Sequence, residues 1–293
     1  MDNNRIPSFF SSFDSSLLDP PLREKWNDLV RSLRGMRRAA VAFSGGVDSS
    51  TLAAAAFYAL GEDMLAVTIH SPVENPQDTL IASQTAHLVG FPHLVIEHND
   101  LEDPNFTANP PDRCYFCKAV RLGVIQKAAA ERGIRVLLEG SNADDAADYR
   151  PGMRAVRERG GISPLMDAGL HKAEVRKLAM ALGLPIWDRP SSPCLASRFP
   201  YGSPITLEGL AKVAAGEAKL RGMGFSTVRV RIHDNLARLE LPMDALAKAV
   251  EQQAAIVEAF HEIGFTYVTL DLAGFRSGSM NEVLAVPVKR DTA

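Results

Sequence analysis

The feature that most constrains the fold of this chain is an alternation of short apolar runs with longer helical stretches. Four runs are mainly apolar and partly β-branched, as buried parallel strands are: Ala39–Phe43, Leu65–Ile69, His93–Ile96 and Val136–Leu138. Each of the three helical stretches among them ends before a glycine, a common helix stop: Ser49–Leu60, Thr79–Val89 and Lys118–Arg132. This order predicts an α/β fold with a doubly wound parallel sheet.

A different pattern begins near residues 200–204. The elements expected there are, in order, a helix, two strands joined by a tight turn, a second helix and a last strand: Leu207–Met223, Thr227–His233, Ala237–Leu241, Ala245–Ile263 and Tyr267–Leu270. We therefore expect a flexible tail over residues 1–20, a large α/β domain over 21–200 and a small α+β domain over 201–293.

Composition narrows the class of protein. The chain has 293 residues, and 46% of them are apolar, which is ample for a core without disulfides or a structural metal. Its net charge of −3 argues against a nucleic-acid partner. The longest apolar run, Leu52–Leu60, is about half of what a membrane span requires, so no membrane partner is expected. The first residues lack the features of a secretory signal, and we expect a cytoplasmic protein.

The strongest local motif is SGGVDSS, over residues 44–50, between an apolar strand and a helix. Gly45 and Gly46 let the backbone approach a ligand, and the helix directs its free N–H groups at the same place. The motif therefore predicts a phosphate site that includes the hydroxyls of Ser44, Ser49 and Ser50. Asp48 suits a Mg²⁺ ion that bridges phosphates. His70, at the end of the next strand, is expected at the same sheet edge.

An acidic loop follows the fourth strand. Asp144 and Asp145 lie in it, and Asp148 makes three aspartates within five positions. Because the sheet order brings this loop near the phosphate loop, Asp144 and Asp145 are candidate Mg²⁺ ligands, and Arg150 is a candidate for binding a phosphate or a carboxylate. A solvated loop that caps a helix is the other interpretation.

Three cysteines indicate chemistry rather than disulfide bonds, because their number is odd and their density low. Cys114 and Cys117 form CYFC, and Cys194 lies in the proline-rich segment RPSSPCLASRFPYG. Three thiolates can hold an iron–sulfur cluster and leave one iron without a protein ligand. Three unrelated buried thiols are the alternative.

Taken together, these segments resemble the LarE-type sulfurtransferases of the PP-loop ATP pyrophosphatase superfamily, over about Val41 to Arg276. The motifs occur in the family's order: SGGVDSS, DLEDPNF, NPPDRCYFCK, EGSNADDAADYRPGMRA, GISPL, WDRPSSPCLASRFPYG and RVRIH. The resemblance implies that ATP adenylylates a carboxylate of pyridinium-3,5-biscarboxylic acid mononucleotide and releases pyrophosphate. Sulfur then displaces AMP, on the way to the nickel-pincer cofactor of lactate racemase.

The resemblance also implies roles for particular residues. In members with one cysteine, the residue that matches Cys194 gives up its own sulfur and becomes dehydroalanine. Members with three cysteines are thought to hold a [4Fe-4S] cluster whose free iron carries an exchangeable sulfide from a donor. The matches to the region that binds the substrate phosphate are Arg229, Arg231, Glu217 and Arg276, the last from a neighbouring subunit of a homo-oligomer.

Period 2 along the strand places Arg229 and Arg231 on one face, which without the resemblance indicates a solvated face. Three other classes of protein remain in view. A cluster-dependent tRNA thiolase would need a basic tRNA-binding surface, and an amidotransferase-type synthetase such as GMP synthetase would have no use for the cysteines. A non-catalytic nucleotide-binding protein would need neither the SGGVDSS loop nor the acidic loop.

Overall fold

The computed structural model describes residues 7–147, 151–276 and 278–284, and the chain divides into two compact units. The first unit comprises Met1–Ser71, Pro76–His98 and Cys114–Ser192, and the second comprises Pro72–Asn75, Asn99–Arg113 and Pro193–Ala293. The sequence placed one boundary after residue 200, whereas two earlier segments and residues 193–200 belong to the second unit. Asn109 shows why, because its side-chain amide donates to the carbonyls of Pro200 and Ser203.

The first unit is built on a four-stranded parallel sheet in the order β3-β2-β1-β4. Its strands are β1 (Ala39–Ala42), β2 (Met64–His70), β3 (His93–Glu97) and β4 (Leu137–Leu138). The predicted α/β fold with a parallel sheet is therefore confirmed. Since the chain crosses from β3 to β4 on the far side of β1, loops after β1 and β4 lie next to each other at the carboxyl edge.

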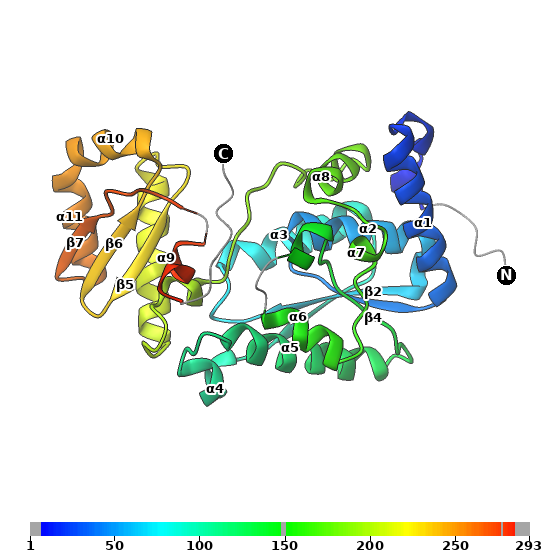
Figure 1. The fold of residues 1–293 in the computed structure, drawn as a ribbon, viewed down its shortest axis with the longest axis horizontal. Helices are drawn as coiled ribbons and strands as arrows, with labels where there is room; N and C mark the ends of the chain where they lie inside the picture. The colour runs from blue at the N-terminus through cyan, green and yellow to red at the C-terminus, as the bar shows by residue number, and fades with distance from the viewer. Residues whose placement is uncertain (1–6, 148–150, 277, 285–293) are drawn as a thin grey trace. The chain divides into compact units, whose positions relative to one another are not determined.

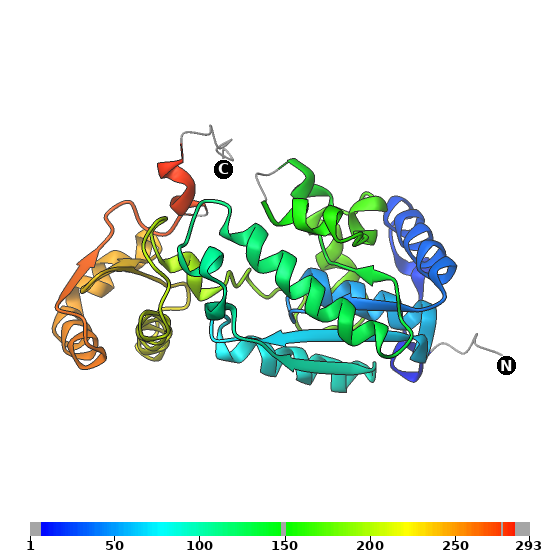
Figure 2. The same ribbon diagram turned by 90° about the horizontal axis from the view of Figure 1, so that it is seen from below.

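Helices cover both faces of this sheet, as Figure 1 shows. On one face α1, α2, α3, α7 and α8 bury one apolar cluster, and on the other α5 and α6 bury a second. Figure 2 shows α5 running along the sheet. The bounds are α1 Pro20–Met36, α2 Val47–Leu60, α3 Pro76–Val89, α5 Arg113–Ala130, α6 Pro151–Glu158, α7 Pro164–Asp167 and α8 Lys172–Ala181.

The flexible tail predicted for residues 1–20 requires correction within the described residues. Two short 3-10 helices, Ser8–Phe10 and Ser15–Leu17, precede α1, and Phe10 is only 2% exposed. Phe13 packs edge-on against Trp26 at 5.2 Å between ring centroids. Burial of these aromatic side chains offsets the entropy that is lost when the segment becomes ordered. The Ser, Pro and Asp content of the segment suggested a tail and did not indicate these contacts.

The second unit carries a three-stranded sheet in the order β5-β6-β7, in which β5 and β6 are antiparallel and β6 and β7 parallel. Its elements are α4 Pro104–Thr107, α9 Leu207–Gly222, β5 Arg229–His233, β6 Leu236–Glu240, α10 Leu246–Glu251, α11 Gln253–Ile263 and β7 Tyr267–Leu270. The single helix predicted over 245–263 is interrupted at Gln252. Among the described residues, no helix is long and apolar enough to cross a membrane.

Candidate active site

The SGGVDSS loop joins β1 to α2 in a conformation that requires glycine. Gly45 has φ +74°, and a Cβ there would lie 3.0 Å from the backbone of Ala82. Gly46 is the N-cap of α2 and contributes no side-chain cap. The first-turn amides of α2 are therefore open toward a ligand, which fits the phosphates of a nucleotide.

The serines of the loop have different places. Ser49 Oγ lies 3.1 Å from Ser44 Oγ and 3.2 Å from the carbonyl oxygen of Gly46, so these two hydroxyls border the loop. Ser50 is instead completely buried, and its Oγ has no hydrogen-bond partner among the described residues. The structure places the side chain of Ser50 in the core. Its contact with ATP stays a prediction.

Asp48 lies in the first turn of α2 and has two partners from other elements. Lys172 Nζ donates to Asp48 Oδ2 at 2.5 Å, and Asn142 Nδ2 donates to Oδ1 at 3.3 Å. The acidic loop after β4 thus meets the phosphate loop, as the sheet order predicts. Sequence reasoning missed Lys172, because nothing in the sequence distinguishes it from other basic residues at helix starts.

The aspartates of the acidic loop hold the loop itself. Asp144 accepts from His171 Nδ1 at 2.6 Å and from the backbone N–H of Lys172 at 2.7 Å. The hydrogen bond from His171, followed by that from Lys172, lowers the pKa of Asp144. Asp145 accepts from the backbone N–H of Asn142 at 3.0 Å. These contacts fit the loop-capping interpretation.

The described residues contain no group of three or more His, Cys, Asp and Glu side chains that could hold a metal ion by themselves. A Mg²⁺ ion that arrives with a nucleotide needs fewer protein ligands, because phosphate oxygens and water fill most of its octahedron. Asp48, which is a quarter exposed beside the open amides of α2, fits this requirement. The predicted roles of Asp144 and Asp145 as Mg²⁺ ligands stay predictions.

The end of β4 packs directly on the phosphate loop. A Cβ on Gly140 would lie 2.9 Å from the backbone nitrogen of Ser49, so only glycine allows this approach. Its neighbour Glu139 is 4% exposed and accepts from Lys118 Nζ at 2.8 Å and from Ser163. Burial alone would raise the pKa of Glu139, but the charge and hydrogen bond of Lys118, together with hydrogen bonds from Ser163 and Ser141, outweigh it, and the pKa is lowered.

Two more side chains border the loop. His70, at the end of β2, places Nδ1 2.9 Å from Thr79 Oγ1. Arg189 Nη1 donates to the carbonyl oxygen of Gly45 at 3.3 Å, and Nη2 donates to Asp78 at 2.5 Å. Because Asp78 neutralises Arg189, this arginine stabilises the loop more than it offers free charge to a ligand.

The three cysteines are divided between the units, and none forms a disulfide. Cys114 and Cys117 lie three residues apart in the first turn of α5, on one helix face, and Cys114 is exposed. Cys194 precedes the 3-10 helix Leu195–Arg198 in the second unit. The thiols are a donor set of the right number and kind for a cluster with three protein ligands, but they do not form a metal-binding group among the described residues.

The Cys194 loop is held by a buried ion pair. Arg198 Nε donates to Glu217 Oε1 at 2.7 Å, and both side chains are at most 6% exposed. The Nη1 atom of Arg198 donates to the carbonyl oxygen of Pro193 at 3.1 Å and lies 3.5 Å from that of Cys194. Glu217, which resemblance linked to the substrate phosphate, is thus placed to fix the loop that carries Cys194.

The arginine face of β5 is buried, so the interpretation as a solvated face was wrong. Arg229 and Arg231 are 8% and 4% exposed, and both donate to Glu240, which is inaccessible to solvent. Arg231 Nη2 also donates to Ser279 Oγ at 2.7 Å. Burial lowers the pKa of both guanidinium groups, and their two positive charges share the single negative charge of Glu240.

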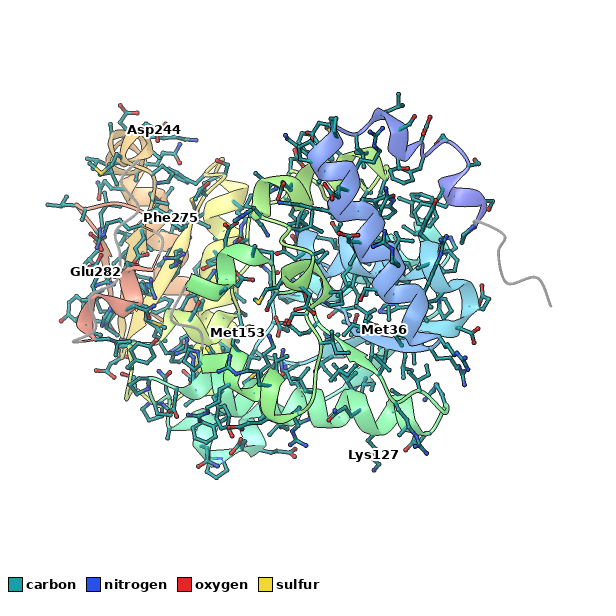
Figure 3. All side chains as sticks on the ribbon, turned by 45° about the vertical axis from the view of Figure 1, so that its right-hand side comes forward. Met36, Lys127, Met153, Asp244, Phe275 and Glu282 are labelled. Carbon is teal, nitrogen blue, oxygen red and sulfur yellow. The ribbon has the colours of Figure 1, made fainter. Side chains whose placement is uncertain are left out.

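Arg276 adds to the charge of this region of the second unit. It pairs with Glu282 at 3.0 Å and with Asp271 at 3.7 Å, and the hydrogen bond that it donates to Glu282 raises its pKa. Phe275, labelled with Glu282 in Figure 3, lies under the guanidinium of Arg229 at 4.4 Å. Arg150, the other candidate for anion binding, lies outside the described residues.

This fold and loop define an ATP-using enzyme of the PP-loop type, and comparison with known proteins agrees. Residues 22–183 match the family model described as asparagine synthase. A pyridinium-3,5-bisthiocarboxylic acid mononucleotide synthase of Lactiplantibacillus plantarum is 38% identical over 264 residues, which cover 90% of this chain and 96% of the relative. The chain belongs to the LarE-type family of ATP-dependent sulfurtransferases.

Two further relatives mark the breadth of the similarity. An uncharacterised protein of Synechocystis is 43% identical over 265 residues, 90% of this chain and 99% of its own length. A subunit of the glutamine-hydrolysing GMP synthase of Pyrococcus abyssi is 29% identical over 203 residues, 64% of this chain and 61% of its own. The similarity to the Lactiplantibacillus plantarum synthase and to the Synechocystis protein covers 90% of this chain, whereas the similarity to the GMP synthase subunit covers 64%.

Proposed function

We propose that this enzyme converts carboxylates of pyridinium-3,5-biscarboxylic acid mononucleotide into thiocarboxylates for the nickel-pincer cofactor. A substrate carboxylate oxygen attacks the α-phosphorus of ATP, the bond to the bridging oxygen breaks, and pyrophosphate leaves with the electron pair. A sulfur nucleophile at the oxidation level of sulfide then attacks the carbonyl carbon and expels AMP. No electrons are transferred to or from the substrate, so no redox partner is required.

The observation that carries this proposal is the similarity to the pyridinium-3,5-bisthiocarboxylic acid mononucleotide synthase of Lactiplantibacillus plantarum, which covers 96% of that protein. The open amides of α2 and the carboxylate of Asp48 support the ATP step. Mg²⁺ held by Asp48 would neutralise phosphate charge. Ser44, Gly45, Gly46 and Ser49 would contact the phosphates through the loop, with His70 at the same sheet edge.

The two neighbouring arginines of β5 support a phosphate site in the second unit. Arg229 and Arg231 share one carboxylate, Glu240, and the phosphate of the pyridinium nucleotide would supply the missing negative charge. Arg276 would contribute from the same chain or from a neighbouring copy in a homo-oligomer. Arg150 stays a candidate outside the described residues.

For the sulfur, we propose a [4Fe-4S] cluster ligated by Cys114, Cys117 and Cys194. Such a cluster would supply sulfide at an iron that lacks a protein ligand, so that the protein is not consumed. The donor set supports it, since a cysteine that gives up its own sulfur would leave the CYFC pair without a role. The sulfide comes from an external donor.

The test is a turnover assay under anaerobic conditions. Protein reconstituted with iron and sulfide is incubated with Mg-ATP, the biscarboxylic nucleotide and sulfide, and thiocarboxylate, AMP and pyrophosphate are quantified. We expect the three products in equal amounts, with more than one thiocarboxylate per chain. Asp48→Asn should abolish pyrophosphate release.

Two results would contradict the proposal. Release of pyrophosphate without any thiocarboxylate would retain the ATP step and refute the sulfur transfer. Pyrophosphate release by Asp48→Asn at the wild-type rate would refute the assignment of the loop. The exposed carboxylate of Asp28, which pairs with Arg31 on α1, provides the matched control, and Asp28→Asn should leave all three products unchanged.

A further inference from the structure

The last peptide before the phosphate loop is held by a side chain of the neighbouring strand. The pairing of β1 with β2 ends at Ala42 and Val67, and Phe43 follows directly. Beyond that point the hydroxyl of Thr68 takes over, because its Oγ1 donates to the carbonyl oxygen of Phe43 at 2.7 Å. Thr68 is only 3% exposed, so little water competes for this bond.

The orientation of this peptide is passed on into the loop. A peptide group is planar, so the direction of the Phe43 carbonyl also fixes the direction of the N–H of Ser44. That N–H donates to Ser49 Oγ at 3.2 Å, and Ser49 Oγ in turn donates to the carbonyl oxygen of Gly46 at 3.2 Å. The hydroxyl of Thr68 therefore acts, through one rigid peptide, on the residues that border the loop.

His93 of β3 orients the hydroxyl of Thr68. In the register of β2 and β3 it is the partner of Ala66, two residues before Thr68, so it lies on the same face of the sheet. His93 Nε2 lies 2.8 Å from Thr68 Oγ1. Because a carbonyl oxygen only accepts, the hydroxyl proton belongs to the bond with Phe43, and Thr68 Oγ1 must accept from the Nε2–H of His93.

The imidazole of His93 is held in the form that this arrangement requires. Burial lowers its pKa, so at neutral pH the ring is neutral and carries one N–H, which the bond to Thr68 assigns to Nε2. The ring also packs edge-on against the ring of Phe43, with 5.4 Å between the ring centroids. Turning away from Thr68 would sacrifice this aromatic contact as well as the hydrogen bond.

We propose that Thr68 and His93 are positioning residues that hold the phosphate loop in its ATP-binding conformation through one chain of hydrogen bonds. The chain runs from His93 to Thr68, then to the peptide between Phe43 and Ser44, and ends at Ser49. Each bond polarises the next, so the chain is stronger than separate contacts would be. Both side chains act through the loop and neither contacts the nucleotide. The inference rests on the ATP step of the proposed function.

The test measures the affinities for Mg-ATP and Mg-pyrophosphate by titration calorimetry in Thr68→Val and Thr68→Ser. Valine keeps the shape of threonine but leaves the carbonyl oxygen of Phe43 without its donor, and it should weaken both ligands about 5- to 50-fold. Serine keeps the hydroxyl and should retain most of the affinity. Thr269→Val is the matched control, because the hydroxyl of Thr269 donates to the carbonyl oxygen of Ala237 on a neighbouring strand of the second unit, and its removal should change neither affinity.

Urea unfolding of the same variants separates positioning from a purely structural role. A hydroxyl that only stabilised the fold would lower the free energy of unfolding and leave the affinity of the folded protein unchanged. Unchanged affinity for Mg-ATP in folded Thr68→Val would therefore overturn the proposal.

His93→Leu provides a second variant, because leucine fills the space but donates no hydrogen bond. It should weaken Mg-ATP about 3- to 10-fold. In the Thr68→Val protein it should have no further effect, since His93 acts through Thr68. Additive effects of the two substitutions would refute the chain. If Thr68→Val does not fold, His93→Leu decides alone, and an unchanged affinity there would overturn the proposal.

These measurements need neither the pyridinium substrate nor sulfur. A wild-type protein that binds Mg-ATP through this loop but makes no thiocarboxylate would refute the proposed function and leave this inference intact. A wild-type protein that makes thiocarboxylate, beside a Thr68→Val protein that binds Mg-ATP equally well, would refute this inference alone.

Discussion

At the scale of single residues, Glu240 illustrates what a buried charge contributes. It is inaccessible to solvent and is the carboxylate that Arg229 and Arg231 share. Glu240→Gln would keep the size of the side chain and leave two buried guanidinium groups without their counter-charge. Breaking a buried ion pair from one side costs about 3–5 kcal/mol, and we expect a destabilisation of that order in the second unit.

Hydrogen exchange of the β5 and β6 amides is the appropriate measurement, because both tryptophans, Trp26 and Trp187, lie in the first unit. Glu262→Gln is the control, since Glu262 is 65% exposed and its pair with Lys219 spans 3.7 Å. That change should stay within about 0.5 kcal/mol. Similar protection in the two variants would mean that Glu240 is not the main compensating charge.

Glu139 leads to a prediction about pH. Its pKa lies below the ordinary value of 4.5 in the folded state, so its stabilisation is complete above about that pH and is lost as the pH falls through the lower folded value. Lys118→Met would remove the ammonium while the burial remains, and burial raises the pKa of Glu139. The loss of stability that Glu139 causes on acidification should then become smaller or reverse, because protonation of a carboxyl whose pKa is raised by burial favours the folded state.

Urea unfolding followed by tryptophan fluorescence between pH 3 and 7 measures this change. At neutral pH we expect Lys118→Met to cost about 1.5–3 kcal/mol, the value of a charge-assisted hydrogen bond. Lys127→Met, on the exposed side of the same helix in Figure 3, should reproduce the wild-type profile. Identical profiles for both variants would show that Lys118 does not set the pKa of Glu139.

The residues that sequence could find at this site are those with a local signal. Gly45 and Asp48 belong to one short motif between a strand and a helix, and the structure places them there. Lys172 lies 124 positions from Asp48, and their contact depends on how α8 packs beside α2. A pairwise contact of this kind has no periodicity and no motif, so only the tertiary structure shows it.

At the scale of elements, apolar runs predicted the four parallel strands because buried strands need apolar side chains on both faces. The small domain was harder. Gln252 interrupts the helix expected over 245–263, and the apolar pattern continues across the break without a proline or glycine to mark it. The ordered conformation of the residues before α1 also escaped detection, since it rests on aromatic contacts with distant residues such as Tyr58.

The contact between β4 and α2 gives a prediction at this scale. Gly140→Ala would place a methyl group 2.9 Å from the backbone nitrogen of Ser49, and backbone cannot move aside as a flexible side chain can. We expect a cost of about 1–3 kcal/mol, typical of overpacking, together with weaker ATP binding because the first turn of α2 shifts. Urea unfolding and calorimetric titration with Mg-ATP measure the two effects.

Gly35→Ala is the matched control for this change. Gly35 lies within α1, and a Cβ there would meet no atom within 4 Å. The substitution should stabilise the first unit by about 0.5–1 kcal/mol, because alanine loses less backbone entropy in a helix. A Gly140→Ala protein with unchanged ATP affinity would show that the β4 loop does not position the phosphate loop.

At the scale of the whole molecule, the chain passes between its two units more often than its sequence suggests. Residues 72–75 and 99–113 belong to the second unit although both follow strands of the first. Thr107 accepts from the N–H of Ile205, and Asn109 accepts from that of Gly202, contacts that join segments almost 100 residues apart. The chain returns to the first unit after each of these segments, so a single boundary drawn along the sequence could not include them.

The cysteines give the prediction that involves both units. If Cys114, Cys117 and Cys194 ligate one cluster, changing any of them to alanine should remove most of the iron and its visible absorbance from anaerobically reconstituted protein. Acid-labile sulfide should fall with the iron in all three variants. Ser8→Ala is the control variant and should keep the full iron content, because Ser8 is not one of the proposed cluster ligands.

The sacrificial mechanism predicts a different pattern. Cys194→Ala alone would then be inactive, Cys114→Ala would remain close to normal, and the wild-type chain would lose the mass of H₂S after a single turnover. Mass spectrometry of the protein after incubation with ATP and substrate distinguishes the two, because dehydroalanine at position 194 would defeat the cluster mechanism. An unchanged mass after many turnovers, with iron lost equally from all three variants, is the expected outcome. It follows from the CYFC pair, since a mechanism that consumes Cys194 requires nothing of Cys114 and Cys117.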